Sequence, residues 1–244
     1  MNALQTNAYT KAWVEIGRSI PRPRAILCIS AHWYIPGVAV TAMERPRTIH
    51  DFGGFPRELF EVNYPAPGSP ELASRVNDLL GGKVILDTSY WGLDHGTWSV
   101  LVHVFPDADI PVVQLSINET EPATFHYDLA RRLTPLRDEG ILVIGSGNLV
   151  HNLHTYAWGN ETREPLDWAL RFDKKVRELI LRDDHDPLVD YESLGRDALL
   201  SAPTPDHYLP LLYVLALKCD DDEIAFPVSG FDGGSISMTA VRIG

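Results

Sequence analysis

Histidines are the residues in this chain best suited to chemistry, and several of its nine follow apolar segments or tight turns. The run at residues 25–29 is apolar and stops at Ser30-Ala31-His32, which places an imidazole at the end of a buried strand. His32 could be a metal ligand or a catalytic group at the rim of a sheet. Alternatively, it only forms a hydrogen bond with a neighbouring loop.

Two further histidines occupy similar positions. His151 follows a glycine-rich turn, Gly145-Ser146-Gly147-Asn148, in which the backbone can approach a ligand closely. The alternative is a loop at the start of a helix, capped by Asn148, with an exposed His151. His154, three residues further on, suits a partner of a ligand or an exposed side chain better than a second ligand.

His207 lies at the predicted start of an apolar helix, with Thr204 as N-cap and Pro205 at the first helical position. A protonated histidine is unfavourable in the first turn of a helix, whereas a neutral, metal-bound imidazole is not. The position therefore mildly favours a metal ligand. Tyr208 follows directly, and we expect it to contact substrate.

His95 lies between glycines and tryptophans in the segment Trp91-Gly92-Leu93-Asp94-His95-Gly96, which predicts a tight turn with aromatic walls. It is a candidate for proton transfer, because an unperturbed imidazole titrates near neutral pH. His50 could line a substrate pocket, or it could be a loop residue paired with Asp51.

The sequence suggests no chemical role for the remaining histidines. His103 is expected to pack within a helix, and His126 and His185 are expected at the surface.

Motifs for several other chemistries are absent from the sequence. It has no Gly-x-Ser-x-Gly nucleophile motif, no phosphate-binding loop and no dinucleotide fingerprint, and no cysteine spacing suggests a structural zinc site. Three histidines on separate loops, with a fourth that can move protons, suit a mononuclear, nitrogen-rich site for iron or zinc.

Strands that alternate with helices must position these side chains. The pattern predicts an α/β fold: a single domain over residues 1–244, with a mostly parallel or mixed central sheet covered by helices on both faces. Ligands of such sheets bind at the carboxyl ends of the strands. The glycine- and proline-rich stretch at 46–70 is long enough to suggest a functional loop. The predicted strands are 25–30, 38–43, 84–86, 111–117, 141–144, 224–228 and 235–243. The principal predicted helices are 57–62, 71–80, 99–105, 123–137, 166–181 and 208–217.

Charge and composition argue against several classes of protein. A net charge of −12 argues against nucleic-acid binding and against anionic membrane surfaces. Only Cys28 and Cys219 are present, so we expect free thiols rather than disulfides. The N-terminus has no signal-peptide pattern, and no apolar stretch approaches the roughly 20 residues of a membrane span. A cytoplasmic protein is expected, with no nucleic-acid or membrane partner.

Six motifs together resemble the 4,5-DOPA extradiol dioxygenase family, which belongs to the class III extradiol ring-cleavage dioxygenases. They occur in the family's order and cover nearly the whole chain. They are Ser30-Ala31-His32-Trp33, Thr48-Ile49-His50-Asp51-Phe52-Gly53-Gly54-Phe55-Pro56, Tyr64-Pro65-Ala66-Pro67-Gly68-Ser69-Pro70, Trp91-Gly92-Leu93-Asp94-His95-Gly96, Gly147-Asn148-Leu149-Val150-His151-Asn152-Leu153 and Pro205-Asp206-His207-Tyr208-Leu209-Pro210-Leu211-Leu212.

The resemblance implies that His32, His151 and His207 bind a metal and that His95 is the acid/base group beside it. It implies Fe(II) as the active metal, with Zn(II) expected to occupy the site on purification, because zinc binds a given nitrogen site more tightly. The substrates implied are O2 and a small catechol such as DOPA.

One feature of the family is missing from the sequence. The family carries an earlier histidine ligand in a Gly-His-Gly-Ser-Pro turn after its first strand, and this chain has no such turn. We expect the coding sequence upstream of the start codon to supply it. We also expect the absent strand to leave unpaired backbone groups beside residues 25–30.

Two other functions compete with ring cleavage. A zinc-dependent hydrolase would use metal-bound water as nucleophile and His95 as base. A non-catalytic binding protein on the same scaffold is the second alternative, because one ligand is missing.

Overall fold

The computed structural model describes residues 2–244, and its contacts divide the chain into two compact units. The first unit comprises the chain up to Thr120 together with Arg132–Ser146, and the second comprises Glu121–Arg131 with Gly147–Gly244. The single domain expected over 1–244 stays a prediction.

A five-stranded sheet forms the centre of the first unit, with strand order β3-β2-β4-β1-β5. Strand β1 is parallel to both β4 and β5, and β2 is parallel to β3 but antiparallel to β4. The sheet is therefore mixed, and the predicted α/β class is confirmed. The strands are β1 (Ala25–Ile35), β2 (Ala39–Thr41), β3 (Ile85–Asp87), β4 (Val112–Asn118) and β5 (Ile141–Ser146).

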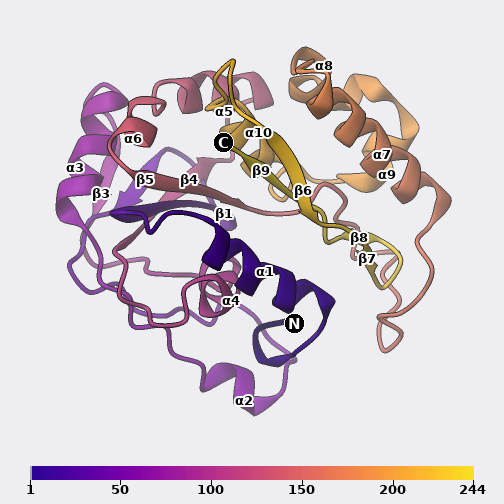
Figure 1. Ribbon diagram of the computed structural model, residues 1–244, viewed down its shortest axis with the longest axis horizontal. Coiled ribbons are helices and arrows are strands. Elements are labelled where there is room, and N and C mark those ends of the chain that lie inside the picture. Colours follow the sequence, from indigo (N-terminus) through magenta and orange to yellow (C-terminus); the bar gives the residue numbers. More distant parts are fainter. Residues whose placement is uncertain (1) are drawn as a thin grey trace. The chain divides into compact units, whose positions relative to one another are not determined.

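Helices cover this sheet. Figure 1 shows α1 and α4 below the sheet and α6 above it. Helix α4 contacts β1, α3 contacts β2 and β3, and α6 contacts β5. The helices of the first unit are η1 (Asn2–Leu4), α1 (Ala8–Ser19), α2 (Arg57–Phe60), α3 (Pro70–Leu79), α4 (His95–Val104) and α6 (Pro135–Asp138).

The central strands form because their sequences are apolar on both faces. Every residue of β4 is buried, and Ile26, Leu27 and Ile29 of β1 are 0 % exposed. Strands of a sheet covered on both faces read as continuous apolar runs rather than as alternating ones. Each such side chain contributes roughly 1.5–3 kcal/mol on burial, which anchors β1 and β4 firmly.

Strand β1 differs from prediction in two respects. It continues to Ile35, and its register against β4 shifts between Ile29 and Tyr34, so His32 lies in the irregular part of a strand rather than after it. It is also paired on both edges, by β4 and β5. The expected unpaired backbone groups beside residues 25–30 are therefore wrong.

Strand β5 differs from the buried strand expected over residues 141–144, because all of its residues are only half-buried. The reason is its place at one edge of the sheet, where only β1 pairs with it.

Helices and two short antiparallel sheets make up the second unit. Helix α5 contacts α10, α7 contacts α9, strands β6 and β9 form one two-stranded sheet, and β7 and β8 form the other. Its elements are α5 (Ala123–Arg131), α7 (Asp167–Leu181), α8 (Asp186–Val189), η2 (Tyr191–Leu194), α9 (Arg196–Ser201), α10 (Leu209–Leu215), β6 (Ile224–Val228), β7 (Phe231–Asp232), β8 (Ile236–Ser237) and β9 (Ala240–Ile243).

Several predicted elements are interrupted or shorter. The helix expected at 123–137 breaks before Pro135, because proline lacks the amide hydrogen and restricts the residue before it. The strand expected at 235–243 is split into β8 and β9. The helix expected from Pro205 begins only at Leu209, so His207 lies in the preceding turn.

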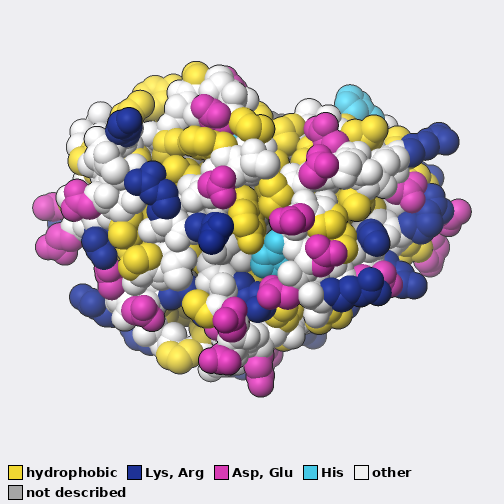
Figure 2. All heavy atoms as spheres, turned by 90° about the horizontal axis from the view of Figure 1, so that it is seen from above, with side chains coloured by type: hydrophobic (Ala, Val, Ile, Leu, Met, Phe, Trp, Pro, Cys, Tyr) yellow, Lys and Arg dark blue, Asp and Glu magenta, His cyan; other side chains and the backbone are white. Residues whose placement is uncertain are grey.

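Charged side chains of both signs are interspersed over the face drawn in Figure 2. No extended basic surface is visible among the described residues on this face of the acidic chain. Among residues 2–244, no helix has the length and apolar character needed to cross a bilayer.

Candidate active site

His95 and Asp51 form the best-defined polar pair of the first unit. His95 is the first residue of α4, where Asp94 caps the helix by accepting a hydrogen bond from the Thr97 amide at 3.0 Å. The carboxylate of Asp51 holds His95 at two points: Oδ1 accepts from the backbone amide at 2.8 Å, and Oδ2 lies 2.8 Å from Nδ1. His95 is thus held at the start of a helix, whereas the sequence predicts a tight turn with aromatic walls.

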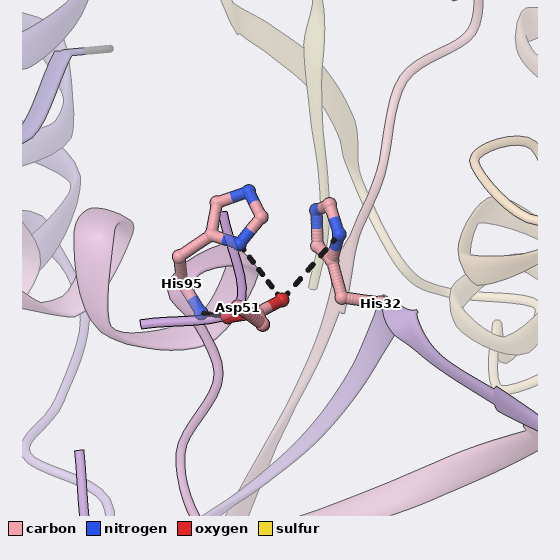
Figure 3. A group of neighbouring side chains, drawn as sticks. All are labelled: His32, Asp51 and His95. Carbon is pink, nitrogen blue, oxygen red and sulfur yellow. Dashed lines mark hydrogen bonds and ion pairs between the residues drawn. The ribbon is translucent and has the colours of Figure 1, made fainter. Parts of the chain in front are cut away.

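His32 stands beside this pair (Figure 3). Its ring centroid lies 3.8 Å from that of His95, and its Nδ1 lies 3.7 Å from Asp51 Oδ2. Both imidazoles stand on the same side of the carboxylate and retain some exposure, 25 % for His32 and 16 % for His95. The irregular part of β1 and the N-terminus of α4 therefore bring two imidazoles and one carboxylate together.

The pKa of Asp51 reflects two opposing influences. Burial would raise it, but the hydrogen bonds and charge of His95, together with the charge of His32, hold the pKa below its ordinary value. Asp51 is therefore a carboxylate near neutral pH and can only accept hydrogen bonds. His95 must carry its hydrogen on Nδ1, which leaves the basic lone pair on Nε2.

This group has the composition of a metal site. One donor atom from each of His32, Asp51 and His95 lies within 4.8 Å of the others, so the three side chains could hold one ion. Two histidines and one carboxylate are typical ligands of non-haem Fe(II).

Aromatic side chains surround the same group. Phe52 meets the His95 ring edge-on, with centroids 5.4 Å apart, and its ring also contacts Phe60 at 4.8 Å. His50 lies in this cluster, 5.6 Å from Trp98, and its Nε2 is 2.9 Å from the carbonyl oxygen of Val62. His50 therefore faces an aromatic wall, formed by Phe52, Phe60 and Trp98, and does not pair with Asp51.

His151 and His207 are brought together within the second unit. Their rings stack with centroids 3.4 Å apart and an angle of 4° between planes. The His151 amide donates to the Ser201 carbonyl at 2.7 Å, and the His207 carbonyl accepts from the Asn148 amide at 2.8 Å. A Cβ on Gly147 would lie 2.2 Å from the His207 carbonyl oxygen, so this close approach requires glycine.

The surroundings of both rings are compatible with metal binding. Burial lowers the pKa of His151, although the charge of Asp206 raises it in part, so the ring is neutral near pH 7. His207 Nδ1 lies 2.9 Å from the amide oxygen of Asn148, which orients the ring and leaves the lone pair on Nε2. Asn148 therefore supports His207 rather than capping a helix.

Tyr208 is placed differently from the expectation of a substrate contact. It is 0 % exposed, and its hydroxyl donates to the Leu188 carbonyl at 3.0 Å. Burial raises the pKa of the Tyr208 hydroxyl well above its ordinary value. The side chain anchors the turn that carries His207.

The other histidines differ in part from prediction. His103 packs within α4 as expected, and His154 is exposed. His126 is fully buried, 2.9 Å from the Tyr213 hydroxyl, because α5 packs its histidine face against α10. His185 is largely buried beside Tyr127, at 2.7 Å. The surface positions expected for these last two are wrong.

Asp51 is the residue of the site that sequence reasoning missed. The sequence suggests it only as a partner of its neighbour His50, whereas it pairs with His95, 44 positions away. A carboxylate next to glycines in a long irregular loop is the only local signal.

The chain is similar to known aromatic ring-opening dioxygenases. Residues 5–232 match the family described as the catalytic LigB subunit of aromatic ring-opening dioxygenase. The chain is 49 % identical to the 4,5-DOPA dioxygenase extradiol of Escherichia coli K12, over 100 % of this chain and 91 % of that protein. It is 36 % identical to the protein of the same name from Beta vulgaris, over 99 % and 92 %.

A solved structure is similar as well. The crystal structure of an uncharacterised Escherichia coli K12 protein matches with a TM-score of 0.86 and 44 % identity, covering 99 % of this chain and 94 % of that one.

Proposed function

Since the chain belongs to the LigB family of aromatic ring-opening dioxygenases, we propose that it is an extradiol enzyme that inserts O2 into a catechol such as DOPA. The observation that supports this most directly is the His95–Asp51 pair, which holds a basic Nε2 beside a second imidazole and an aromatic wall. Cleavage would occur next to the two hydroxyls of the ring.

We propose His32, His151 and His207 as the metal ligands. Both oxygens of Asp51 already accept hydrogen bonds from His95, which suits Asp51 to orienting that residue rather than to binding metal. Burial favours the neutral form of His151, and the side chain of Asn148 orients the His207 ring. Ligation by His32, Asp51 and His95 is the alternative that the test below separates.

Iron is the metal proposed for activity. Fe(II) supplies redox chemistry with O2 and a template for both substrates. Zinc binds a nitrogen-rich site more tightly but has no redox chemistry, so zinc in a purified sample is compatible with this function.

His95 and Asp51 would carry out the transfer of the substrate's proton. His95 Nε2 accepts a catechol proton while Nδ1–H keeps its hydrogen bond to Asp51, whose negative charge stabilises the imidazolium formed. The same nitrogen can return the proton to the opened ring. Its clamped position means that no reorientation is needed between the two steps.

Substrate recognition is assigned to the aromatic wall. Phe52 lies beside His95, and His50 lies beside Phe52. Aromatic pairs of this kind would favour a flat ring by about 0.5–1.5 kcal/mol beyond the area buried. We retain His50 as a substrate contact. Tyr208 acts on substrate only through the turn that it anchors.

The proposed partners are thus a small catechol and O2, with no nucleic acid or membrane. With only two cysteines, Cys28 and Cys219, the chain lacks the disulfide framework of many secreted proteins, which favours a reducing compartment such as the cytoplasm.

Oxygen uptake tests the function. Protein loaded anaerobically with Fe(II) should consume O2 when DOPA or another catechol is added and release a ring-opened semialdehyde, whereas Zn(II)-loaded protein should not. Ester hydrolysis by the zinc form without oxygen uptake by the iron form would favour a hydrolase. Inactivity of both forms, despite stoichiometric metal, would overturn the enzyme assignment in favour of a binding protein.

Metal content tests the ligand set. We expect His32→Ala, His151→Ala and His207→Ala to lose stoichiometric metal while circular dichroism stays unchanged. Asp51→Ala should keep metal and lose turnover. His154→Ala is the matched control, because it removes an exposed imidazole from the same segment. Retention of metal by His151→Ala, with loss by Asp51→Ala, would assign the ion to His32, Asp51 and His95 instead.

A further inference from the structure

A buried polar network lies directly beneath His32 and His95. Asp94 is 0 % exposed and accepts hydrogen bonds from the Thr97 amide, the Gln114 side-chain amide and the Ser30 hydroxyl. Gln114, also 0 % exposed, accepts from the Asp94 amide at 3.1 Å and from the Thr97 hydroxyl at 3.0 Å through its Oε1. Burial and the charge of Asp51 raise the pKa of Asp94, whereas these three hydrogen bonds, all donated to the carboxyl group, favour its ionised form.

The network joins the two elements that carry the imidazoles. Ser30, on β1, accepts a hydrogen bond from the His32 amide at 3.3 Å, while Asp94 caps the helix that starts at His95. A Cβ on Gly96 would lie 2.5 Å from Ser30 Oγ and 2.7 Å from His32 Cδ2. Strand and helix are therefore in direct contact at this point, and Asp94 connects them.

We propose that Asp94 and Gln114 are positioning residues, which set the separation of the His32 and His95 rings through Ser30 and the helix cap. The inference rests on the proposed function for its catalytic consequence, but its effect on metal binding can be measured independently. A buried carboxylate is costly unless every lone pair is satisfied, so stability alone would favour apolar residues here. The network instead defines one arrangement of the strand against the helix.

An exchange of the two side-chain types tests the hydrogen-bond pattern. In Asp94→Asn the new amide faces the Gln114 amide, donor against donor. In Gln114→Glu two carboxylates face each other. The double variant restores the hydrogen bond between the two side chains, because the carboxylate introduced at position 114 would accept from the amide introduced at position 94. That carboxylate would still accept from the residue-94 backbone and Thr97. The double variant also keeps the net charge.

We expect each single variant to lower kcat about 10–100-fold and to weaken Zn²⁺ affinity. The reason is that His32 and His95 would be displaced by up to about 1 Å. The double variant should return both values to within about threefold of the parent. Folded single variants with parental kcat and Zn²⁺ affinity would show a purely stabilising network. A folded double variant that stays impaired would show that the charge at position 94 matters, not the pattern. Either result overturns the proposal.

A milder change covers the case in which these variants do not fold. Ser30→Ala removes only the hydroxyl between Asp94 and the His32 amide, and it should weaken Zn²⁺ binding and kcat with a small change in Tm. Ser116→Ala is the matched control: Ser116 is equally buried in β4, but its hydroxyl bonds the Ala39 amide at 2.8 Å, outside the network. Equal Zn²⁺ affinity in the Ser30 and Ser116 variants would refute the proposal, even if the protein had no oxygenase activity.

Discussion

Substitution of Gly96 by alanine should disturb the site without altering any functional group. Gly96 is buried in the first turn of α4, where its backbone is helical and needs no glycine for conformational reasons. Its added Cβ would lie 2.7 Å from His32 Cδ2 and 2.5 Å from Ser30 Oγ. Restoring the first contact to an ordinary 3.4 Å requires His32 to move by about 0.7 Å.

Two energies oppose each other in this variant. Overpacking a tight interior typically costs about 1–3 kcal/mol, whereas alanine gains up to about 1 kcal/mol over glycine in a helix. A net loss of about 0–3 kcal/mol in the free energy of unfolding follows. Zn²⁺ affinity should change more than stability does, because displacement of a ligand or of the groups that support it typically lowers metal affinity about 10–100-fold.

The assay combines urea unfolding with competitive Zn²⁺ titration. Gly53→Ala is the control: Gly53 lies in the loop near Asp51, has no atom within 4 Å of an added Cβ and does not have a positive φ. The control should keep parental stability and affinity. Parental Zn²⁺ affinity in Gly96→Ala would refute the reasoning, since it would mean either that His32 does not bind metal or that β1 can move away freely.

Three further results are expected. His95→Ala should keep its metal but lose about 10²–10⁴-fold in turnover, and loss of metal would make His95 a ligand. Cys219, which is exposed, should react with a thiol reagent at pH 8 in the native protein. Cys28 should react only after denaturation, because burial raises its pKa to about 12. Two reactive thiols in the native protein would contradict this prediction. Tyr213→Phe removes the hydroxyl beside buried His126 and should cost about 1–3 kcal/mol in urea unfolding, and an unchanged midpoint would mean that the contact contributes nothing.

The parts of the fold that could be predicted are those with strong local patterns. The apolar runs of β1 and β4 and the amphipathic face of α7 indicate their structure directly, because burial dominates their energetics. His32 could be identified as a candidate because it follows such an apolar run, and His95 because glycines and tryptophans flank it.

Contacts between distant segments could not be predicted. Asp51 pairs with a residue 44 positions away, and nothing in its own surroundings distinguishes it from a loop carboxylate. His126 reads as a surface residue from its helix alone, and only packing of α5 on α10 buries it. The short helices between 186 and 201 escape prediction because each is too brief to show a periodicity.

The loop that carries Asp51 has little regular structure, yet it is tied to the segment before α4 and to the helix itself. The Ile49 amide donates to the Leu93 carbonyl at 2.7 Å, the Leu93 amide to the Arg47 carbonyl at 2.8 Å, and the His95 amide to Asp51. Local opening would have to break these bonds together, so their amides should exchange slowly with deuterium. The wall beside His95 is then ordered before any substrate arrives. Selection among substrates would depend on fit to a preformed surface, with little ordering entropy lost on binding.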